Sequence, residues 1–593
     1  MQYRTYLSDG ISHEMLEKEV MMAGWVHRYR DHGGVIFIDL RDHKGLCQLV
    51  CNPDDKQLFA KAEQCRSEYV IRIKGIVKQR PEGTLNKDLS SGAFEIHVGT
   101  LDILNQSLPL PFSVDDESHT QIGEATRLRY RYLDMRRKDL LQALKVRSAV
   151  SRVMRNTLDA KGFLEIETPV LTKPTPEGAR EYYVPSRNSP LHAYALGQSP
   201  QQFKQTLMIG GIDKYYQIVK CFRDEDLRAD RQPEFTQLDL EMGFADRDVV
   251  MQVATEIMQS VFQEVMDEKL PDVTVMTYSD AMLRYGTDKP DLRNPLYLVP
   301  LESHCQNCGF NVFEDPAKKE GHRVVGMRVP NGCQLTRKQL DEYTKYVSNY
   351  GARGLAYIKV NAYEDPETWQ SPIIKFLGID TVKAMLKDMD CESGDCVFFG
   401  AGTDKVVSQS MDALRNKIGK DLALIKKGWA PLWVVDFPMF EQEEDCWKAM
   451  HHPFTAPFVD SVSAFKASYA KLTSQAYDFV LNGHEIAGGS VRIHDYDMQM
   501  AALDVLGLDE VQAKEKFGHL LTALQYGAPP HAGIAFGLDR LMMLLLDRES
   551  IRDVIAFPKT QSASCMLTDA PGPMDANSLK ELGLRSAVIS EII

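Results

Sequence analysis

The chain has 593 residues, 44% of them hydrophobic and 26% charged, which is too long for one hydrophobic core and ordinary in composition for a globular protein. A formal net charge of −14 argues against a general nucleic-acid-binding protein, and no run of about 20 apolar residues predicts a membrane span. The first residues lack the apolar segment of a secretory signal, and eleven cysteines in a chain of this size predict reduced thiols in a cytoplasm.

Residues 1–105 predict a small β-barrel. Stretches such as MMAGWVHRYR (21–30) and GVIFIDL (34–40) have strand character, and DHGG and HKGL mark turns between them. About five short strands favour an OB-type barrel, a fold often used on single-stranded nucleic acid, although any small β domain would have the same composition. Charge is nearly balanced in this segment, with 14 Lys and Arg against 15 Asp and Glu, so it tolerates a polyanionic partner better than the rest of the chain.

The next elements alternate between helix and strand patterns. Residues 106–130 are polar and contain several prolines, which predicts a linker. An apolar stripe predicts a helix over 145–162 that ends at Gly162, and FLEIETPVLT (163–172) predicts a strand that Pro169 halts.

Residues 288–420 form a segment with a pattern of its own, which predicts an inserted α+β domain. It contains a predicted helix at 336–351 and a predicted strand at 354–360, and strand character resumes at 430–440. Four cysteines, at positions 305, 308, 391 and 396, only loosely imitate the spacing of a zinc site, so incidental thiols are the preferred interpretation.

The segment 222–244 concentrates charged residues before an alternating run. With a period of two, one face of the first predicted strand carries Cys221, Arg223 and Glu225, and one face of the second carries Phe235, Gln237, Asp239 and Glu241. A solvated surface hairpin is the ordinary interpretation of so many charges. An aromatic ring among them favours a site that stacks a base and binds phosphate through a guanidinium.

Three stretches resemble the signature motifs of class II aminoacyl-tRNA synthetases: GFLEIETPVL (162–171) motif 1, FRDE (222–225) with RQPEFTQLDLE (231–241) motif 2, and GIAFGLDRLMMLL (533–545) motif 3. QSPQQFKQ (198–205), MHHPFT (450–455), GGSVRIH (488–494) and RDVIAFPK (552–559), together with TPEGAREYYVPSR, narrow the resemblance to the bacterial-type aspartyl-tRNA synthetase family. The resemblance covers essentially the whole chain.

That resemblance implies an α+β multidomain protein with an N-terminal OB-fold barrel, an antiparallel-sheet catalytic core and an inserted domain. The expected domains are the barrel at 1–105, the hinge at 106–130, the core at 131–287 and 421–560, the insertion at 288–420 and a C-terminal extension at 561–593. The family activates L-aspartate with ATP and transfers it to tRNA, as a homodimer built partly through motif 1. A sister enzyme for asparagine or lysine, or a synthetase-like RNA-binding protein without catalysis, are the alternatives. The second would be expected to have lost the arginines and carboxylates that are present here.

The resemblance also implies roles for individual residues. Arg223 and Arg540 are the expected catalytic cations on the phosphates. Aspartate is expected to bind to Glu177, Gln201, Lys204, Arg223, Asp239, His451 and Arg492. ATP is expected to bind to Arg223, Asp224, Glu225, Gln232, Phe235, Glu485, Gly537, Leu538, Asp539 and Arg540. Mg²⁺ is expected on Asp478 and Glu485, although Asp478 alone would also fit a surface carboxylate.

In the barrel, the family's anticodon-contacting positions are Arg30, Phe37, Gln48 and Glu95; an apolar strand pattern alone would equally place Phe37 in the core. The anticodons for aspartate and asparagine differ only at the third base, C against U, which present opposite hydrogen-bonding edges. His32 and Gly83 stand where strictly tRNA(Asp)-specific enzymes commonly carry Leu and a longer polar residue. They resemble the non-discriminating subgroup, which also aspartylates tRNA(Asn) for a downstream amidotransferase. A strictly tRNA(Asp)-specific enzyme with ordinary loop variation is the alternative.

Overall fold

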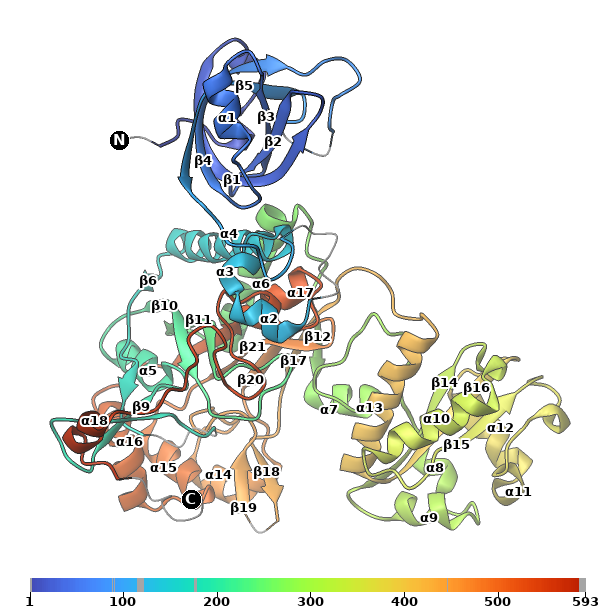
Figure 1. The fold of residues 1–593 in the computed structure, drawn as a ribbon. Helices are drawn as coiled ribbons and strands as arrows, with labels where there is room; N and C mark the ends of the chain where they lie inside the picture. The colour runs from blue at the N-terminus through green and yellow to red at the C-terminus, as the bar shows by residue number, and fades with distance from the viewer. Residues whose placement is uncertain are drawn as a thin grey trace, which may run out of the picture. The chain divides into compact units, whose positions relative to one another are not determined.

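The computed structural model describes residues 3–87, 89, 91–114, 122–174, 179–444 and 446–585. Contacts divide the chain into two compact units, one of residues 1–143 with 565–568 and one of the remaining residues. Figure 1 shows the fold as a ribbon. None of the described helices is long and apolar enough to cross a membrane.

The first unit contains a closed five-stranded barrel, which confirms the predicted OB fold. Its strands are ordered β1-β2-β3-β5-β4, with β3 and β5 parallel and the other pairs antiparallel. Their bounds are β1 Glu19–Asp31, β2 Ile36–Arg41, β3 Leu46–Cys51, β4 Val70–Gln79 and β5 Phe94–Asn105, with helix α1 at Lys56–Ala62. Alternate residues of each strand fill the interior with aliphatic side chains, so the other side of each strand faces outward.

Helices follow the barrel. Helix α2 (Glu124–Arg129) lies within the stretch predicted as a linker, and α3 (Arg131–Asp134) follows directly. Helix α4 (Lys138–Ala160) begins seven residues before its predicted start at 145, and Gly162 follows its end with a φ of +77°. The left-handed conformation of this glycine explains why the helix stops there.

The second unit is built on an eight-stranded sheet of order β12-β17-β20-β21-β22-β11-β10-β6 (Figure 1). The six central strands pair antiparallel, and the edge strands β12 and β6 pair parallel with their neighbours, so the sheet is mixed. The bounds are β6 Leu164–Glu165, β10 Lys214–Phe222, β11 Glu234–Gly243, β12 Thr274–Thr277, β17 Pro431–Val435, β20 Ala476–Leu481, β21 His484–Val491 and β22 His531–Gly537. Segments from both sides of the predicted insertion therefore share one sheet.

The strand predicted over 163–172 is wrong for most of its length. Only Leu164–Glu165 pairs with β10, and Leu171–Thr172 forms β7 of a separate small sheet with β8 (Tyr183–Pro185) and β9 (Ala193–Leu196). The segment lies at a sheet edge, where Pro169 has no N–H to donate and little pairing is available.

Helices and a hairpin complete the core. Helices α5, α6 and α17 contact the central strands β11 and β22. The bounds are α5 Gln201–Ile209, α6 Arg247–Val261, α7 Tyr278–Tyr285, α14 Val462–Ser468, α15 Tyr496–Val505, α16 Glu510–Leu524, α17 Leu538–Leu545 and α18 Ala576–Glu581, with the hairpin β18 Phe440–Glu443 and β19 Cys446–Ala449.

The inserted segment has its own four-stranded sheet of order β13-β14-β16-β15 with helices against both faces. Its strands are β13 Val299–Pro300, β14 His322–Val329, β15 Ala356–Val360 and β16 Asp395–Thr403; its helices are α8 Glu302–Cys305, α9 Asn311–Lys318, α10 Arg337–Ser348, α11 Ile374–Leu377, α12 Ile379–Asp388 and α13 Asp404–Asp421. The predicted helix and strand inside it are confirmed as α10 and β15. Cys305 and Cys391 belong to the core on one face and Cys396 to the core on the other, so these thiols do not converge on one ion.

Gly489 of β21 provides a test of how closely the central strands approach. A Cβ at this position would overlap the carbonyl oxygen of Gly533 on β22. We expect Gly489→Ala to destabilise the protein by about 1–3 kcal/mol, because the two strands must separate to admit a methyl group. The measurement is the melting temperature of the purified variant.

The matched control is Gly99→Ala on β5, where a Cβ would make only an ordinary contact of 3.7 Å with the Lys74 carbonyl oxygen. Equal melting temperatures for Gly489→Ala and Gly99→Ala would contradict the close approach.

Candidate active site

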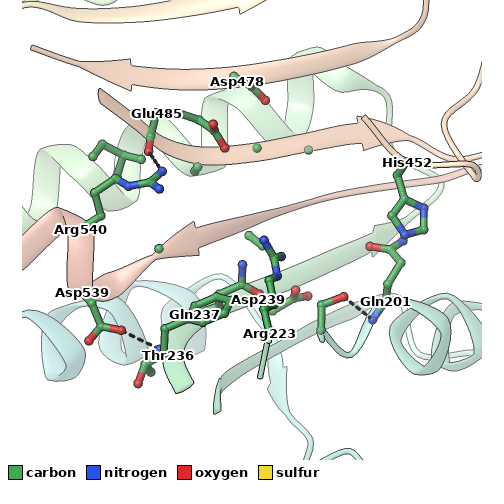
Figure 2. Close-up of a pocket in the computed structure, with 18 of the residues that line it drawn as sticks. Gln201, Arg223, Thr236, Gln237, Asp239, His452, Asp478, Glu485, Asp539 and Arg540 are labelled. Carbon is green, nitrogen blue, oxygen red and sulfur yellow. Dashed lines mark hydrogen bonds between the residues drawn. The ribbon is translucent and has the colours of Figure 1, made fainter. Parts of the chain in front are cut away.

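A cavity of about 350 Å³ opens on the central strands of the eight-stranded sheet. Most of the residues predicted for the site line it: Gln201, Lys204, Arg223, Glu225, Gln232, Phe235, Asp239, His451, Asp478, Glu485, Arg492, Gly537, Asp539 and Arg540. Figure 2 shows Asp478 and Glu485 on neighbouring strands with Arg540 beside Glu485, and Arg223 next to Asp239 below them. One surface thus brings together residues from positions 201 to 540 of the chain.

The β10–β11 hairpin supplies one wall of this cavity. The two strands pair antiparallel, as the sequence predicts, and the structure places Cys221 opposite Phe235. The predicted placement of Arg223 and Glu225 on the first strand is wrong, because β10 ends at Phe222 and both residues lie in the following loop. The Arg223 guanidinium nevertheless lies over the Phe235 ring, 5.0 Å from its centroid, and its buried Nε has no hydrogen-bond partner among the described residues.

Two cations and two carboxylates are buried together at the floor of the cavity. Lys204 Nζ lies 2.9 Å from Asp239 Oδ1 and 3.0 Å from Glu241 Oε2. Arg492 donates from Nε and Nη2 to Glu241 at 2.9 and 3.2 Å, and from Nη1 to Ser490 Oγ at 2.7 Å. Arginine has five N–H donors, so two remain for a ligand in the cavity.

The pKa values of the Asp239 and Glu241 carboxyl groups are shifted in opposite directions. Burial raises the pKa of Asp239, and the opposing Lys204 charge does not cancel that effect. Burial acts in the same direction on Glu241, but the Arg492 and Lys204 charges prevail and bring its pKa to about 2. Glu241 therefore stays ionised at neutral pH and holds both cations in place.

Glu241 is a residue that the sequence analysis placed on the polar face without giving it a role. The signal was present, because a buried Lys and a buried Arg need more than one carboxylate between them. The pairing of Arg492 with Glu241 rather than with Asp239 could be predicted only if it were known that β21 and β11 both flank β22.

Asp478 and Glu485 share a face because of an irregularity in the sheet. Asp478 pairs with Gly488, but the register of β20 and β21 shifts between Phe479 and Val480, so that Glu485 lies opposite Val480. In a regular ladder Glu485 would point to the other side of the sheet. The extra residue on β21 thus brings the second carboxylate to the first.

The two carboxylates converge over a glycine. A Cβ built on Gly488 would lie 2.9 Å from Asp478 Oδ1 and 3.6 Å from Glu485 Oε1, so a side chain there would fill the space between them. Asp478 Oδ1 is buried without a hydrogen-bond partner among the described residues, and burial with the neighbouring Glu485 charge holds the pKa of Asp478 well above its usual range. Paired carboxylate oxygens short of a cation fit a hard divalent ion such as Mg²⁺.

Helix α17, which carries motif 3, places Arg540 beside Glu485. Arg540 Nη1 donates to the Glu485 carbonyl oxygen at 2.6 Å, and Nη2 lies 3.4 Å from Asp230 Oδ2. Asp539 accepts from the Thr236 N–H at 2.7 Å and from Arg147 Nη1 at 2.5 Å, so its carboxylate fastens β11 to α17 and α4.

Several predicted residues are placed differently from the rest. The Gln232 amide is occupied by the Lys559 backbone, accepting from its N–H at 2.7 Å and donating to its carbonyl at 3.0 Å. Leu538 is buried in α17, and neither it nor Asp224 lines the cavity. Glu177 lies outside the described residues.

Gln201 and His451 also line the cavity and have different neighbours. The Gln201 amide donates to Gln205 Oε1 at 3.0 Å. His451 packs edge-on against the Phe437 ring and its Nδ1 lies 3.7 Å from Asp478 Oδ1. Burial lowers the pKa of His451 to about 4, although the Glu485 charge opposes the effect, so the ring is neutral at pH 7.

The predicted anticodon residues form a continuous outer face of the barrel. Arg30 and Phe37 are cross-strand partners, and so are Gln48 and Glu95. Arg30 pairs with Asp39 through two bonds of 2.8 Å, and Gln48 donates to Glu95 at 3.2 Å. Interior positions beside Phe37 are filled by other side chains, and Phe37 itself is only half-buried, so its placement in the core is wrong.

His32 and Gly83, the two positions predicted to affect acceptance of tRNA(Asn), have different surroundings. His32 is exposed, and its ring meets the Phe37 ring edge-on at 5.8 Å between centroids. Gly83 has a φ of +85°, and a Cβ there would meet nothing within 4 Å. Open space lies where a longer side chain would stand.

Family models and individual relatives both show similarity to tRNA synthetases. Residues 123–561 match tRNA synthetases class II (D, K and N), and residues 20–104 match the OB-fold nucleic acid binding domain. Proteins of Legionella pneumophila strains Philadelphia 1 and Paris, each described as "Aspartate--tRNA(Asp/Asn) ligase", are 52% identical over 588 residues, covering 98% of this chain and 99% of theirs.

Solved structures share the fold at lower identity. Asparaginyl-tRNA synthetase from Pyrococcus horikoshii, complexed with asparaginyl-adenylate, has a TM-score of 0.58 at 20% identity, covering 94% of this chain and 99% of that one. A putative aspartyl-tRNA synthetase from Leishmania major Friedlin has a TM-score of 0.59 at 19% identity, covering 94% of each chain.

The lowered pKa of His451 predicts a pH dependence of stability. The unfolded chain takes up a proton near pH 6.5 and the folded one near pH 4, so this residue makes the fold less stable as the pH falls through that window. At pH 5 the cost is on the order of 2 kcal/mol. His451→Gln should lose less unfolding free energy than the wild type between pH 7.5 and 5.

The measurement is urea unfolding of both proteins at the two pH values in the presence of a chelator. Other titrating groups are common to both proteins and cancel in the difference. Parallel losses of unfolding free energy would contradict the buried, neutral ring.

Proposed function

The chain belongs to the class II tRNA synthetases for D, K and N, and on this premise we propose that it is an aspartate–tRNA ligase that charges both tRNA(Asp) and tRNA(Asn). The observation that carries the amino-acid assignment is the buried set Lys204, Asp239, Glu241 and Arg492. Two buried cations with spare donors suit a side-chain carboxylate, which asparagine and lysine lack. The relatives at 52% identity, which are described as aspartate–tRNA(Asp/Asn) ligases, agree with this choice.

The first half-reaction is a phosphoryl-type transfer. An oxygen of the α-carboxylate of aspartate attacks the α-phosphorus of ATP, a mixed anhydride forms, and the bond to the bridging oxygen breaks so that pyrophosphate leaves with the electron pair. Arg223 and Arg540, which both line the cavity, are the groups that would neutralise the phosphates. Phe235 offers a ring face for adenine, and Glu225 a carboxylate for its edge.

The second half-reaction forms the aminoacyl ester. A hydroxyl at the 3′ end of tRNA attacks the aspartyl carbonyl carbon, AMP leaves, and the hydroxyl proton is released. The protein's contribution is to hold both reactants against the sheet and to balance charge. Gln201 and Glu177 are proposed to bind the α-ammonium group, and His451 to close over the ligand as a neutral ring.

Mg²⁺ is proposed to bind at Asp478 and Glu485. The fit rests on the unpartnered Asp478 oxygen and on the convergence of both carboxylates over Gly488. When bound, the ion would neutralise phosphate charge. Without it, two neighbouring carboxylates would repel the polyphosphate.

The proposal that both tRNA(Asp) and tRNA(Asn) are charged rests on residues of the barrel. Arg30, Phe37, Gln48 and Glu95 would contact the anticodon, with Phe37 as the stacking ring. The absence of a side chain at Gly83 removes a polar contact that could reject U at the third anticodon base, and His32, beside Phe37, stands in place of the leucine of strictly specific enzymes. A strictly tRNA(Asp)-specific enzyme is the alternative.

A homodimer is proposed from the exposed apolar surface around motif 1. Among the described residues of 164–194, the exposed large hydrophobic side chains are Leu164, Val170, Leu171, Tyr183, Val184, Leu191 and Tyr194. A second copy of the chain is the expected occupant, because the resemblance places the subunit contact at motif 1. We place the enzyme in the cytoplasm, where ATP and tRNA are found and where the eleven cysteines, none of which forms a disulfide, would stay reduced. An amidotransferase would consume aspartyl-tRNA(Asn).

The experiment that tests the proposal is side-by-side aspartylation of purified tRNA(Asp) and tRNA(Asn) transcripts at matched salt. We expect comparable charging of both, because the barrel has little with which to reject the second. Charging of tRNA(Asp) alone would reduce His32 and Gly83 to loop variation and support the alternative. Pyrophosphate exchange that responds to asparagine or lysine but not to aspartate would overturn the amino-acid assignment.

Arg223 tests the nucleotide side of the proposal. We expect Arg223→Ala to abolish aspartate-dependent ATP–pyrophosphate exchange, a loss of at least about 10²-fold, because charge developing on the phosphate loses its cation. The guanidinium lies at a cavity wall, so the melting temperature should stay near that of the wild type.

Lys220→Ala is the matched control, since Lys220 is an exposed cation at the end of the same hairpin strand. Exchange near the wild-type rate in Arg223→Ala would show that another group holds the phosphate.

A further inference from the structure

The turn between β20 and β21 is the nearest chain connection between Asp478 and Glu485. Leu481 pairs with His484, which leaves Asn482 and Gly483 as a two-residue turn with φ values of +52° and +82°. Asn-Gly with two left-handed residues is the sequence that such a hairpin turn requires. Glu485 follows Gly483 by two residues, so the position of this turn bears directly on its carboxylate.

The segment that leads into the inserted domain contacts this turn. A Cβ built on Gly483 would lie 3.1 Å from the Asp291 Cβ, so the two backbones are in close contact. Arg293 holds the Asp291 carboxylate through Nε at 3.0 Å and Nη2 at 2.8 Å. Arg415, from helix α13 at the far end of the insertion, donates to the Asp291 carbonyl oxygen at 2.6 Å.

The segment that returns from the inserted domain contacts the same turn. The Asn482 side chain accepts from the Ala430 N–H at 2.9 Å and donates to the Gly428 carbonyl oxygen at 3.3 Å. That carbonyl also lies 3.4 Å from Arg293 Nη1. We call Asp291, Arg293, Gly428, Ala430 and Asn482 the root cluster.

The charges of the leading segment also reach the acidic pair. After burial and Glu485, the groups that act on the pKa of Asp478 are Asp288, which raises it, and Lys289, which lowers it. Both residues precede Asp291 by no more than three positions, in agreement with the contact at Gly483.

We propose that the root cluster positions the metal-binding carboxylates: by holding the β20–β21 turn, it fixes Glu485 against Asp478 and ties the inserted domain to metal-dependent ATP binding. Asp291, Arg293 and Asn482 are positioning residues: Asn482 belongs to the turn, Asp291 contacts it, Arg293 holds Asp291 and Gly428, and none of the three lines the cavity. The inference rests on the proposed function in one respect, that Asp478 and Glu485 bind Mg²⁺ with ATP.

Asn482→Gly is the most selective test. Glycine keeps the left-handed turn and removes only the amide that binds Gly428 and Ala430. The dissociation constant of ATP is measured by calorimetry, once with Mg²⁺ and once with a chelator, without amino acid or tRNA. We expect the constant with Mg²⁺ to rise about tenfold, as for other residues that orient metal ligands, and the constant in chelator to change by less than about twofold.

Lys417→Ala is the matched control, because it removes an exposed ion pair with Asp421 in the inserted domain's helix α13 and touches none of the root cluster. It should leave both constants unchanged. Arg293→Ala is the second variant and should repeat the selective loss with Mg²⁺.

Unchanged binding with Mg²⁺ in both root-cluster variants would overturn the inference, and so would an equal loss with and without the ion, which indicates general damage to the site. A wild-type affinity for ATP that does not respond to Mg²⁺ would overturn it as well. Failure of the proposed function is seen separately, as absence of aspartate-dependent exchange in the wild type.

Discussion

The buried charge balance among Lys204, Asp239, Glu241 and Arg492 is the constraint on which the site depends. Moving any one of these groups out of water costs several kcal/mol, and the loss is recovered only when distances and hydrogen bonds are close to ideal. Lys204 comes from α5, Asp239 and Glu241 come from β11, and Arg492 directly follows β21, so the helix and the two strands must be placed together for any of the charges to be tolerated. The same requirement produces a cavity floor that recognises a carboxylate.

The sheet meets this requirement through close backbone contacts. Gly533 lies between β11 and β21 on β22, and a side chain there would overlap the Glu241 carboxylate. Glycine at this position lets Glu241 pass across the strand to Arg492. On the neighbouring strand, Gly488 leaves the space into which Asp478 and Glu485 point. Amino-acid and metal positions are therefore both set by glycines of the central strands.

Much of this arrangement could be predicted from the sequence. The alternation of residue types predicted the antiparallel pair β10–β11 and the strands of the barrel, because successive side chains of a strand point to opposite faces. Prediction failed where the pattern depends on partners far away in sequence. β6 is short because it lies at an edge, and Arg223 lies past the end of its strand.

The remaining features of the site could not be predicted from any local sequence pattern. The register shift that turns Glu485 toward Asp478 inserts one residue into a ladder whose pairing is known only from the structure. The partner of Arg492 likewise depends on strand order, which alternation does not specify. Candidate residues could be found by resemblance to a family, but their hydrogen bonds, and the role of Glu241, required the fold.

The order of strands in the eight-stranded sheet also explains why the inserted domain lies between β12 and β17. Strands β12 and β17 are parallel neighbours, and such a pair needs a crossover connection. A long connection costs little more conformational entropy than a short one, so this crossover can hold a whole domain. Its two ends must return to adjacent strands and hence lie near each other, where Arg293 and Arg415 join them. Since β20 is the next strand of the sheet, its turn is the one that both ends can reach. A domain inserted at this crossover is consequently anchored beside the two carboxylates, whatever else it binds.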